Sequence, residues 1–506
     1  MPKFYEFASE WAAFLVFLGG IMFTIGLSEI ARKFFHWRAE FSRKLVHVLV
    51  GVLLAFAPFV LSSPTPAIVL GILFIIINYF ALRSEIFAGM HATSRVSYGT
   101  VYFPIAFVIM VALYWDHNPA IMLTSLLILA FADTTASIVG ERLVYSRTFT
   151  FWFDKKTIPG SVTFFITAFL VVMLTFPWFL SLDIHQHPPL PFSFILLISV
   201  ITALTSTFAE SASRQGSDNL TLTIAAALTL DLTLQSYYDG HLQIFMGWFC
   251  FSAILGWTAF RLSLLTSGGA VGAFIMGIFM FGMGGWPFML PLIVFFLLSS
   301  LLSKLAEKKH STVYRINAKG SNRDIVQVYA NGGIALIVTI MWYFTGNPLL
   351  YAVFLGAIAA STADTWETEF GSLSRKFPRH ILTFKPVAQG YSGGISLPGT
   401  LGGLLGALTI GAVGYAFNPH LMPLGTWLLV TSGSGFLGSI VDSIIGATIQ
   451  AKFACTVCGK ETEKQRHCGL PTVLIGGIRA MDNDWVNIIC TASGAGFALL
   501  LIALLT

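Results

Sequence analysis

Apolar stretches separated by short polar segments run from one end of the chain to the other. Most are about 16–22 residues long, enough for a helix to cross a hydrocarbon core of about 30 Å. The pattern predicts an all-α polytopic membrane protein with about sixteen transmembrane helices. The predicted spans are 11–30, 45–62, 66–82, 99–115, 119–140, 159–180, 191–210, 219–233, 243–262, 268–284, 286–303, 330–345, 348–363, 397–417, 424–448 and 487–505.

Composition supports this prediction. Of the 506 residues, 56% are hydrophobic and only 10% are charged, and the mean hydropathy is +0.78. A soluble protein carries roughly a quarter charged residues. Because no small-residue cleavage site follows the first apolar stretch, we expect it to be a retained span and not a signal peptide.

Nearly all the lysine and arginine residues lie in alternate loops of the predicted topology. Only Lys3 among the 29 basic residues falls on the opposite side. Since basic loops stay in the cytoplasm, we expect these loops to be cytoplasmic and both termini to lie outside. The net charge of +5 then reflects topology, and no nucleic-acid partner is expected. The basic loops are 31–44, 83–98, 141–158, 211–218, 304–329, 364–396 and 449–486.

Four short motifs occur twice, in the same order and at similar spacing. Such a pattern is typical of a tandem repeat. We predict two halves of about eight spans each. Because eight is an even number, both halves would have the same orientation in the membrane. The predicted domains are 1–235 and 236–506. The paired motifs are ADTTASIVG (132–140) with ADTWETEFG (363–371), PGS (159–161) with PGT (398–400), AES (209–211) with VDS (441–443), and DN (218–219) with DN (482–483).

An aspartate closes an apolar helix in each half, at Asp133 and Asp364. A charge inside the bilayer costs at least about 2.5–3.5 kcal/mol, so an acid at the helix end indicates access to water or a ligand. Carboxylates beside hydroxyls suit a hard cation such as Mg²⁺, which would carry nucleotide phosphates. Glu367 and Glu369 either add metal ligands or are surface charge.

Lysines and a glycine-rich helix start follow each aspartate, in DKKTIPGS (154–161) and FKPVAQGYSGGISLPGT (384–400). Amide groups at a helix N-terminus bind anions, although Pro-Gly-Ser is also an ordinary helix start. Enzymes of phosphoryl transfer commonly combine acids that bind a metal ion with lysine and glycine residues that bind phosphate. The predicted phosphate-binding residues are Lys156, Gly160, Ser161, Arg323, Lys385, Gly393, Gly394, Gly399 and Thr400.

Further polar residues at helix ends are expected to complete the two sites. Glu210 and Asp442 are candidates to accept the proton of the acceptor hydroxyl. The two Asp-Asn pairs, Asp218 with Asn219 and Asp482 with Asn483, are candidate nucleotide contacts, with helix capping as the competing role.

Three of the five cysteines lie together in the predicted loop 449–486. Cys455, Cys458, His467 and Cys468 are the residue types of a four-ligand zinc site. The adjacency of His467 and Cys468 opposes simultaneous ligation, so a loop with buried thiols is the alternative.

The sequence contains neither of two common nucleotide-binding sites. The chain has no GxxxxGK(S/T), which excludes a P-loop kinase. GSGFLG at 433–438 matches GxGxxG but lies within a predicted span, where close helix packing is expected.

The first half resembles the CTP-using membrane kinases of the dolichol kinase and phytol kinase group. The resemblance covers most of residues 40–230. One departure is Pro159, which stands where the family pattern Lys-x-x-Glu-Gly-Ser has an acid. The matching segments are RKLVHVLVG (43–51), SYGTVYFP (97–104), ADTTASIVGER (132–142), KKTIPGS (155–161) and AESASRQGSDNLTL (209–222).

The second half resembles the plant phytyl-phosphate kinase family and its uncharacterised relatives. The two resemblances together imply consecutive steps: an isoprenoid alcohol becomes its monophosphate and then its diphosphate, with CTP as donor and Mg²⁺ as cofactor. The matching segments are GSNRDIVQVYANGG (320–333), ADTWETEFG (363–371), GYSGGISLPGTLGG (390–403), FLGSIVDSIIGATIQ (436–450) and the Cys/His loop through MDNDWVN.

Two other functions fit part of the pattern. Internal repeats and intramembrane acids also occur in transporters, although transporter sites lie near the bilayer midplane and these acids lie at helix ends. A cytidylyltransferase acting on a lipid phosphate shares part of the motif set. Release of CDP would indicate a kinase, and release of pyrophosphate a cytidylyltransferase.

Overall fold

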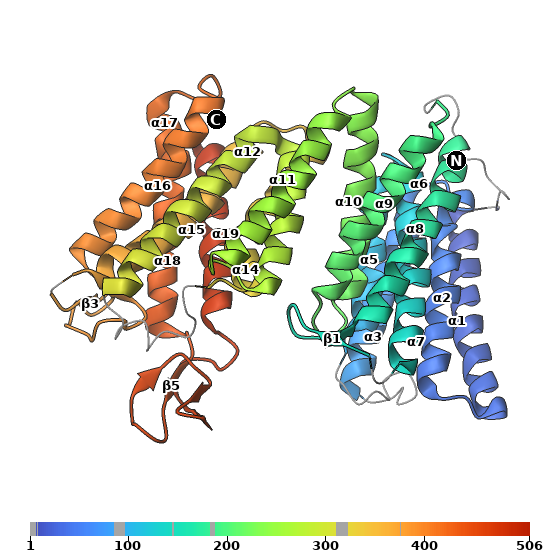
Figure 1. The fold of residues 1–506 in the computed structure, drawn as a ribbon, viewed down its shortest axis with the longest axis horizontal. Coiled ribbons are helices and arrows are strands. Elements are labelled where there is room, and N and C mark those ends of the chain that lie inside the picture. The colour runs from blue at the N-terminus through green and yellow to red at the C-terminus, as the bar shows by residue number, and fades with distance from the viewer. Residues whose placement is uncertain are drawn as a thin grey trace. The chain divides into compact units, whose positions relative to one another are not determined.

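The structure, a computed structural model, describes residues 7, 9–84, 97–143, 146–182, 188–309, 322–374 and 376–505. They form two compact units, Met1–Met246 and Gly247–Thr506, called unit 1 and unit 2 here (Figure 1). The division lies beyond the predicted domain boundary at 235–236. Three predicted features lie partly outside the described residues: the first two residues of the GSNRDIVQVYANGG motif, residues 85–96 of the loop 83–98, and residues 310–321 of the loop 304–329.

Unit 1 is built from helices with one short hairpin, β1 (Thr148–Phe149) paired with β2 (Lys156–Thr157). Its helices are α1 (Glu10–Phe35), α2 (Ala39–Ala55), η1 (Ala57–Phe59), α3 (Pro64–Ser84), α5 (Gly99–Tyr114), α6 (Pro119–Ile128), η2 (Leu129–Asp133), α7 (Thr134–Arg142), α8 (Ile158–Ser181), α9 (Phe192–Ser211) and α10 (Asp218–Tyr238), while α11 (Leu242–Arg261) begins at its end.

Two helices form the centre of unit 1. Every described side chain of α6 after its first residue is buried, and α10 is buried along most of its length. The hydroxyls of Thr223, Thr229 and Thr233 on α10 each donate to the carbonyl four residues earlier. This bond satisfies a polar group without leaving the helix, so threonine is tolerated in an apolar interior. The outer helices α1 and α3 expose large apolar side chains instead.

Unit 2 repeats the helix-and-hairpin plan and adds a small sheet region. Its other helices are α12 (Ser267–Lys309), α14 (Ile325–Thr345), α15 (Leu350–Ser372), α16 (Leu397–Phe417), α17 (Leu424–Leu428), η3 (Leu429–Gly433), α18 (Ser434–Thr448) and α19 (Asn483–Leu505). Its strands are β3 (Arg379–His380), β4 (Gly394–Ile395), β5 (Lys452–Ala454), β6 (Glu461–Thr462), β7 (Arg466–His467), β8 (Leu470–Pro471) and β9 (Val473–Gly476).

The centre of unit 2 is α15, whose first fourteen residues are all buried and which packs against α16, α18, α19, α14 and α12. Its core contains aromatic side chains in contact, such as Phe288 and Phe354, whose ring centroids lie 4.7 Å apart. The long helix α12 is interrupted at Gly285, whose φ of 61° is left-handed. The predicted break between spans 268–284 and 286–303 falls at this glycine.

The predicted all-α architecture with many membrane-length helices is confirmed, but the number sixteen is not. In the described part of the chain, eleven helices are long and apolar enough to cross a membrane. Helices α2, α5, α10 and α15 coincide with predicted spans but are shorter or more polar than those eleven. The two predicted spans on α12 are one interrupted helix.

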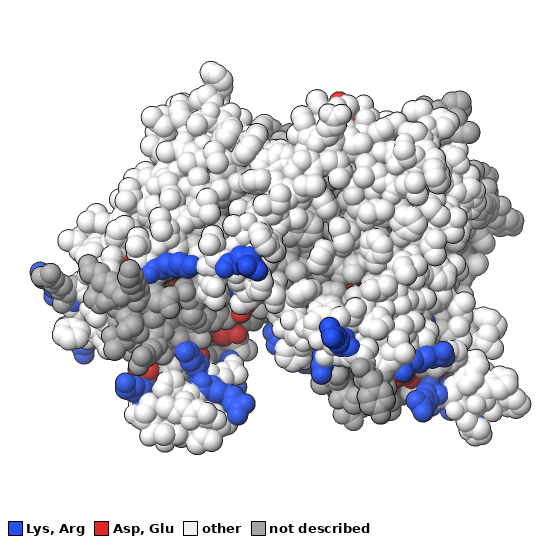
Figure 2. Space-filling view, viewed as in Figure 1, with Lys and Arg blue, Asp and Glu red and all other residues white. Residues whose placement is uncertain are grey.

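Charged side chains gather at one end of each unit. In unit 1 lysine and arginine lie at the end that carries β1, and in unit 2 at the end that carries β3 and β5 (Figure 2). The visible surface away from these ends is almost entirely uncharged. This is the distribution expected when the charged loops lie in water and the rest faces hydrocarbon. The side of the membrane on which these ends lie stays a prediction.

Candidate functional site

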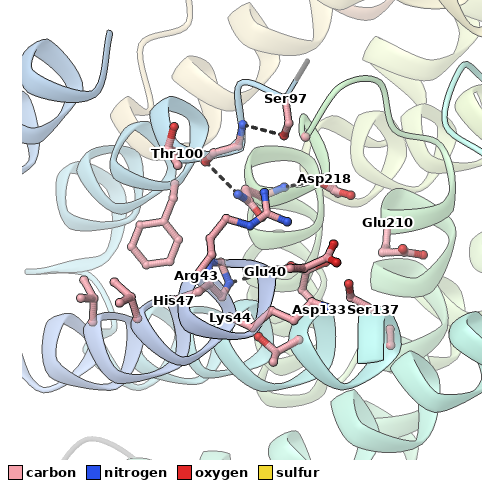
Figure 3. A pocket seen from close by; sticks show the side chains of 18 of the residues that line it. Glu40, Arg43, Lys44, His47, Ser97, Thr100, Asp133, Ser137, Glu210 and Asp218 are labelled. Carbon is pink, nitrogen blue, oxygen red and sulfur yellow. Dashed lines mark hydrogen bonds and ion pairs between the residues drawn. The ribbon is translucent and has the colours of Figure 1, made fainter. Parts of the chain in front are cut away.

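Unit 1 contains a cavity of about 690 Å³ with a polar end and an apolar end. Helices α1, α2, α3, α5, α7 and α8 and the turn between α9 and α10 supply its lining. Figure 3 shows its polar end, where acidic and basic side chains from several helices point toward one another.

Three carboxylates form the acidic part of this cavity. Asp133 lies at the end of η2, Glu210 in the last turn of α9, and Asp218 at the first position of α10. One oxygen from each lies within 4.8 Å of the others. The turn η2 is π-helical within an otherwise α-helical rod, and such bulges are frequent at functional sites. The sequence predicted these acids separately, and the fold brings them together.

The tight turn between α9 and α10 places Glu210 beside Asp218. Gly216 has a φ of +88°, and a Cβ there would lie 2.6 Å from the amide nitrogen of Gly99. Only glycine fits this left-handed, closely packed position. Asn219 then donates its side-chain amide to the Gly99 carbonyl at 2.8 Å, which fixes the start of α10 against α5. Asn219 therefore has a clear structural contact in addition to its predicted role.

Lys156 from β2 reaches into the acidic cluster. Its ammonium forms ion pairs with Glu210 and with Asp218, the latter at 3.0 Å. Burial alone would lower the pKa of Lys156, but the carboxylates of Glu210 and Asp218 raise it above its ordinary value. The lysine therefore stays charged and offsets part of the negative charge, which a buried carboxylate cluster requires. Asp133 makes no ion pair with Lys156 among the described residues.

A stripe along α2 forms the opposite wall. Glu40, Arg43, His47, Val50 and Leu54 recur at three- and four-residue spacing and all line the cavity, so one helix face changes from charged to apolar. Figure 3 shows Arg43 extending from α2 toward the middle of the polar end. The sequence reasoning did not select Arg43, although this helical spacing was the available signal.

Two other α2 side chains are held in place. His47 Nε2 lies 3.2 Å from the carbonyl oxygen of Leu129 and 3.9 Å from Asp133 Oδ2. Lys44 forms an ion pair with Glu141 on α7. These contacts join α2 to the helix that carries Asp133. Arg43 differs from Lys44 and His47 in this respect: among the described residues its guanidinium forms no ion pair.

The other end of the cavity is apolar. Ile21 and Ile25 of α1, Leu54 of α2, Leu70 of α3 and Phe107 of α5 line it. A site of this kind, largely hydrophobic with a few convergent polar groups, is typical of a small-molecule pocket. Because the apolar end continues from the charged end, an amphiphile fits with its polar head at Asp133.

The start of α8 packs closely against α7. Thr157 caps α8 by accepting the amide of Gly160 at 3.2 Å. A Cβ on Gly160 would lie 3.2 Å from the Ala136 carbonyl oxygen. This amide is thus engaged in the cap and this glycine has a packing role; phosphate binding by Gly160 stays a prediction. Ser161 lines the cavity, with Oγ 3.4 Å from that of Ser211.

Unit 2 builds the same crossing. Ser396 caps α16 by accepting the amide of Gly399 at 3.2 Å. A Cβ on Gly399 would lie 2.8 Å from the Glu367 carbonyl oxygen, so α16 and α15 are in close contact. Thr400 donates its amide to the Ser396 carbonyl at 2.8 Å. The amides of Gly399 and Thr400 are therefore engaged within the helix start.

Two acids of unit 2, Asp364 and Asp442, lie near each other on neighbouring helices. The carboxyl groups of Asp364 on α15 and Asp442 on α18 lie close enough to interact directly. The oxygen Oδ2 of Asp442 is buried without a hydrogen-bond partner. Glu367 lies one helical turn from Asp364 and interacts with Ser439 of α18. Asp364, Asp442 and Glu367 are therefore brought to one place.

Glu369 is directed away from Asp364 and Asp442, and Arg323 also lies apart from these two acids. Glu369 is buried and accepts a hydrogen bond from Ser303 of α12. The Arg323 guanidinium lies over the ring of Phe295, 5.1 Å from its centroid, and borders a small apolar pocket with Asn331. Glu369 is directed to α12 while Asp364 is directed to α18, so the predicted three-acid metal set is spread over two faces.

Other predicted residues of unit 2 have local structural roles. Lys385 is exposed in the β3–β4 hairpin, and among the described residues its ammonium forms no ion pair. Gly394 belongs to β4, and Gly393 has a φ of +83° with its backbone against Ala447. Asp482 is exposed, and its Oδ1 accepts the amides of residues 484 and 485 at the start of α19. Asn483 is the first residue of that helix.

One residue near the unit 2 acids was not predicted. Glu463 comes from the loop between α18 and α19, and its Oε1 accepts hydrogen bonds from Ser392 at 2.6 Å and Gln450 at 3.0 Å. Its charge also acts on Asp364 and Asp442. Nothing in the local sequence pattern distinguishes it from other loop acids. The same loop gathers Cys455, Cys458, His467 and Cys468.

Comparison with known proteins places the second half in a family. Residues 250–495 match the family described as integral membrane protein DUF92. Protein PGR of Arabidopsis thaliana is 36% identical over 252 residues, covering 45% of this chain and 85% of that protein. An uncharacterized membrane protein of Methanocaldococcus jannaschii is 33% identical over 215 residues, covering 42% of this chain and 83% of the relative.

A further relative has an enzymatic name. Phytol kinase of Synechocystis sp. is 27% identical over 216 residues, covering 42% of this chain and 86% of that protein. No solved structure matches the chain. Each of these relatives aligns with less than half of the chain.

Proposed function

We propose that this chain, which belongs to the DUF92 family of integral membrane proteins, is a membrane phosphotransferase acting on isoprenoid alcohols. Unit 1 transfers a phosphoryl group to the alcohol, and unit 2 transfers a second one to the resulting monophosphate. CTP is the donor and Mg²⁺ the cofactor. The name of the Synechocystis relative, phytol kinase, supports this class of reaction.

The observation that carries the proposal is the continuity of the unit 1 cavity. Its polar end gathers three carboxylates, Lys156 and Arg43, and its apolar end is lined by helices α1, α2, α3 and α5. Phosphoryl transfer needs positioning and charge stabilisation more than covalent chemistry. A lipid alcohol needs an apolar slot for its chain. One cavity offers both.

The acidic residues fit a divalent cation by donor chemistry. Asp133, Glu210 and Asp218 offer three carboxylate oxygens close together, and Mg²⁺ prefers oxygen ligands and binds by a few carboxylates plus substrate phosphates. When bound, Mg²⁺ would supply charge neutralisation on the phosphates. Lys156 holds Glu210 and Asp218 in place beside the cation, and Arg43 contacts phosphate oxygens. Asp133, which forms no ion pair with Lys156, takes the predicted role of Glu210 and accepts the hydroxyl proton of the alcohol.

In unit 2, the facing acids Asp364 and Asp442 take the corresponding part. The buried Asp442 Oδ2 without a partner is the atom available to a ligand, because a buried polar atom left unpaired is costly. Glu367 is next to this pair. Joining both steps in one chain raises the effective concentration of a poorly soluble intermediate.

The test is an assay of the purified full-length protein in detergent or lipid vesicles. CTP or ATP with Mg²⁺ is offered with phytol, farnesol or geranylgeraniol, and mono- and diphosphates are separated. We expect CTP-dependent monophosphate first and diphosphate later, with CDP as coproduct. Pyrophosphate as coproduct from a lipid phosphate would instead identify a cytidylyltransferase. Failure to phosphorylate any of these alcohols with either nucleotide would overturn the proposal, and uptake into vesicles would support a transporter.

A further inference from the structure

The loop between α18 and α19 has its own small fold. Strands β6, β5 and β9 form one antiparallel sheet, and β7 pairs with β8. Each strand has only two to four residues, and buried apolar side chains are few in this region: Ala451, Phe453 and Cys455. Segments below about 40 residues seldom hold a fold by burial alone and usually need a disulfide or a metal. Something other than a core must stabilise this region.

Four potential metal ligands lie close together in this loop. The sulfur atoms of Cys455, Cys458 and Cys468 and a ring nitrogen of His467 all lie within 4.8 Å of one another. His467 Nδ1 is 3.6 Å from Cys458 Sγ and 3.3 Å from Cys468 Sγ. Zinc bonds of about 2.3 Å to sulfur and 2.1 Å to nitrogen put neighbouring tetrahedral ligands roughly 3.5–3.8 Å apart. The observed separations are close to those of a tetrahedral zinc site.

The backbone that links Cys455 and Cys458 forms a tight turn. The Gly459 amide donates to the Cys455 carbonyl, and the Cys455 amide donates to the Lys460 carbonyl, both at 2.9 Å. The Val457 amide points at Cys455 Sγ, 3.4 Å away. Gly459 completes the turn with a φ of +67°. Amide groups directed at sulfur stabilise a thiolate, which is the form that binds metal.

The adjacency of His467 and Cys468, which the sequence presents as an obstacle, is resolved by backbone conformation. Cys468 has a φ of 51° and Gly469 a φ of +81°. Left-handed geometry is unfavourable for a non-glycine residue and persists where the surroundings require it. Here it turns the Cys468 side chain back toward the imidazole of its own neighbour, so both side chains reach the same point.

We propose that Cys455, Cys458, His467 and Cys468 bind one structural Zn²⁺ ion, and that this ion holds the loop against the acidic site of unit 2. Four protein ligands complete a tetrahedron and leave no open position, which is the pattern of structural and not catalytic zinc.

Two contacts connect this loop to the glycine-rich segment beside Asp442. Lys452 of β5 donates to the hydroxyl of Tyr391 at 2.8 Å, and its ammonium lies 4.0 Å from the centre of that ring. Glu463, which lies between β6 and β7, accepts from Ser392. Gly393 follows directly and packs on α18. Loss of the metal would therefore loosen the contacts between this loop and residues 391–393.

The test measures metal in the full-length protein purified without added chelator. We expect about one zinc per chain by mass spectrometry of metals, and loss of most of it in Cys458→Ser. The matched control is Cys250→Ser, because Cys250 is an exposed thiol on α11, outside the loop. Both variants are compared with the wild type by size-exclusion profile, so that misfolding is recognised.

A second measurement uses the wild type alone. After mild chelation and dialysis, Co²⁺ is added, and we expect the absorption bands of tetrahedral cobalt with sulfur ligands. Chelation should also speed proteolysis within 449–486, and Zn²⁺ should restore protection. Absence of zinc together with no cobalt spectrum, or thiols found oxidised to a disulfide, would overturn the proposal. These readouts do not depend on kinase activity, so this proposal and the proposed function can fail separately.

Discussion

In unit 1 the helix that carries Asp133 crosses the start of α8, and in unit 2 the helix that carries Asp364 crosses the start of α16 in the same way. Each crossing has a short hairpin before it and a hydroxyl cap. Gly140 meets Gly160 in one unit, and Gly371 meets Gly399 in the other. The two units are therefore built alike at this crossing, while the tandem repeat stays a prediction.

The two units differ in how the negative charge is balanced. In unit 1 the residue before the capping Thr157 is Lys156, which pairs with two carboxylates. In unit 2 the residue before the capping Ser396 is Ile395. Among the described residues, neither Asp364 nor Asp442 forms an ion pair with a lysine or arginine. One scaffold thus carries a lysine-neutralised cluster in one place and a carboxyl pair that needs a shared proton or a cation in the other.

Removing the lysine should have the largest effect. Lys156→Met leaves buried carboxylates without their partner, so we expect the protein to lose about 3–5 kcal/mol of stability. Thermal denaturation in detergent measures this. Lys155→Met is the control, since Lys155 is exposed. Millimolar Mg²⁺ should raise the Tm of the variant more than that of the wild type; equal shifts would contradict a cation site among these acids.

Asp133→Asn should separate the two steps. We expect monophosphate formation to fall by about 10²–10⁴-fold, because an acid that accepts the hydroxyl proton is removed. Conversion of supplied monophosphate to diphosphate should stay within about twofold of the wild-type rate, because Asp133 belongs to unit 1 and substitutions away from a site usually change its energetics by less than about 0.5 kcal/mol. The control is Asp239→Asn, an exposed acid of unit 1. Unchanged monophosphate formation would exclude Asp133 from the reaction.

Asp364→Asn is the mirror experiment in unit 2. The diphosphate should fall about 100-fold and the monophosphate should accumulate, since Asp364 and Asp442 act as a pair. Product separation after a time course measures both. If Asp133→Asn and Asp364→Asn impair the same step, the division of labour between the units is wrong.

Filling the apolar end of the unit 1 cavity tests where the isoprenoid chain binds. Val50 lines the cavity from α2, and Val50→Trp should raise the KM for geranylgeraniol by roughly tenfold, since lost apolar contacts of this size are worth about 1–3 kcal/mol. The shorter farnesol should be affected less. Steady-state kinetics with both alcohols measures the difference, and equal effects on both would place the chain elsewhere.

The close crossings should show the smallest effects. Gly399→Ala puts a methyl group against a backbone oxygen, and overpacking of this kind costs about 1–3 kcal/mol. Gly160→Ala should cost less, because its nearest contact is the hydroxyl of Thr157. Gly19→Ala, with nothing within 4 Å, is the control. Equal Tm values for all three would mean that the crossings tolerate wider spacing.

Much of the polar end of unit 1 could be predicted, but the prediction that Asp133 closes its helix is wrong, because the helix continues through α7 to Arg142. Asp133, Glu210 and Asp218 each stand out in a chain with few charges. The same reasoning treated Asp482 as the partner of Asp218, but Asp482 caps α19 while Asp218 pairs with Lys156. A sequence pattern marks the end of a helix equally well in both cases. It does not say whether a lysine from another segment reaches that end.

The sequence by itself determined the apolar helices and the repetition of the motifs, because hydrophobicity and spacing act locally along the chain. It was wrong about where the helices end, since α15 continues past Asp364 to Ser372. Only the tertiary structure decided which ends meet: it directed Glu369 toward α12, left Lys385 exposed and carried Glu463 to Ser392. These outcomes depend on how helices distant in sequence pack and on the backbone geometry of single residues such as Cys468. Contacts between distant segments depend on how closely their side chains pack, and the periodicity of a sequence does not specify that packing.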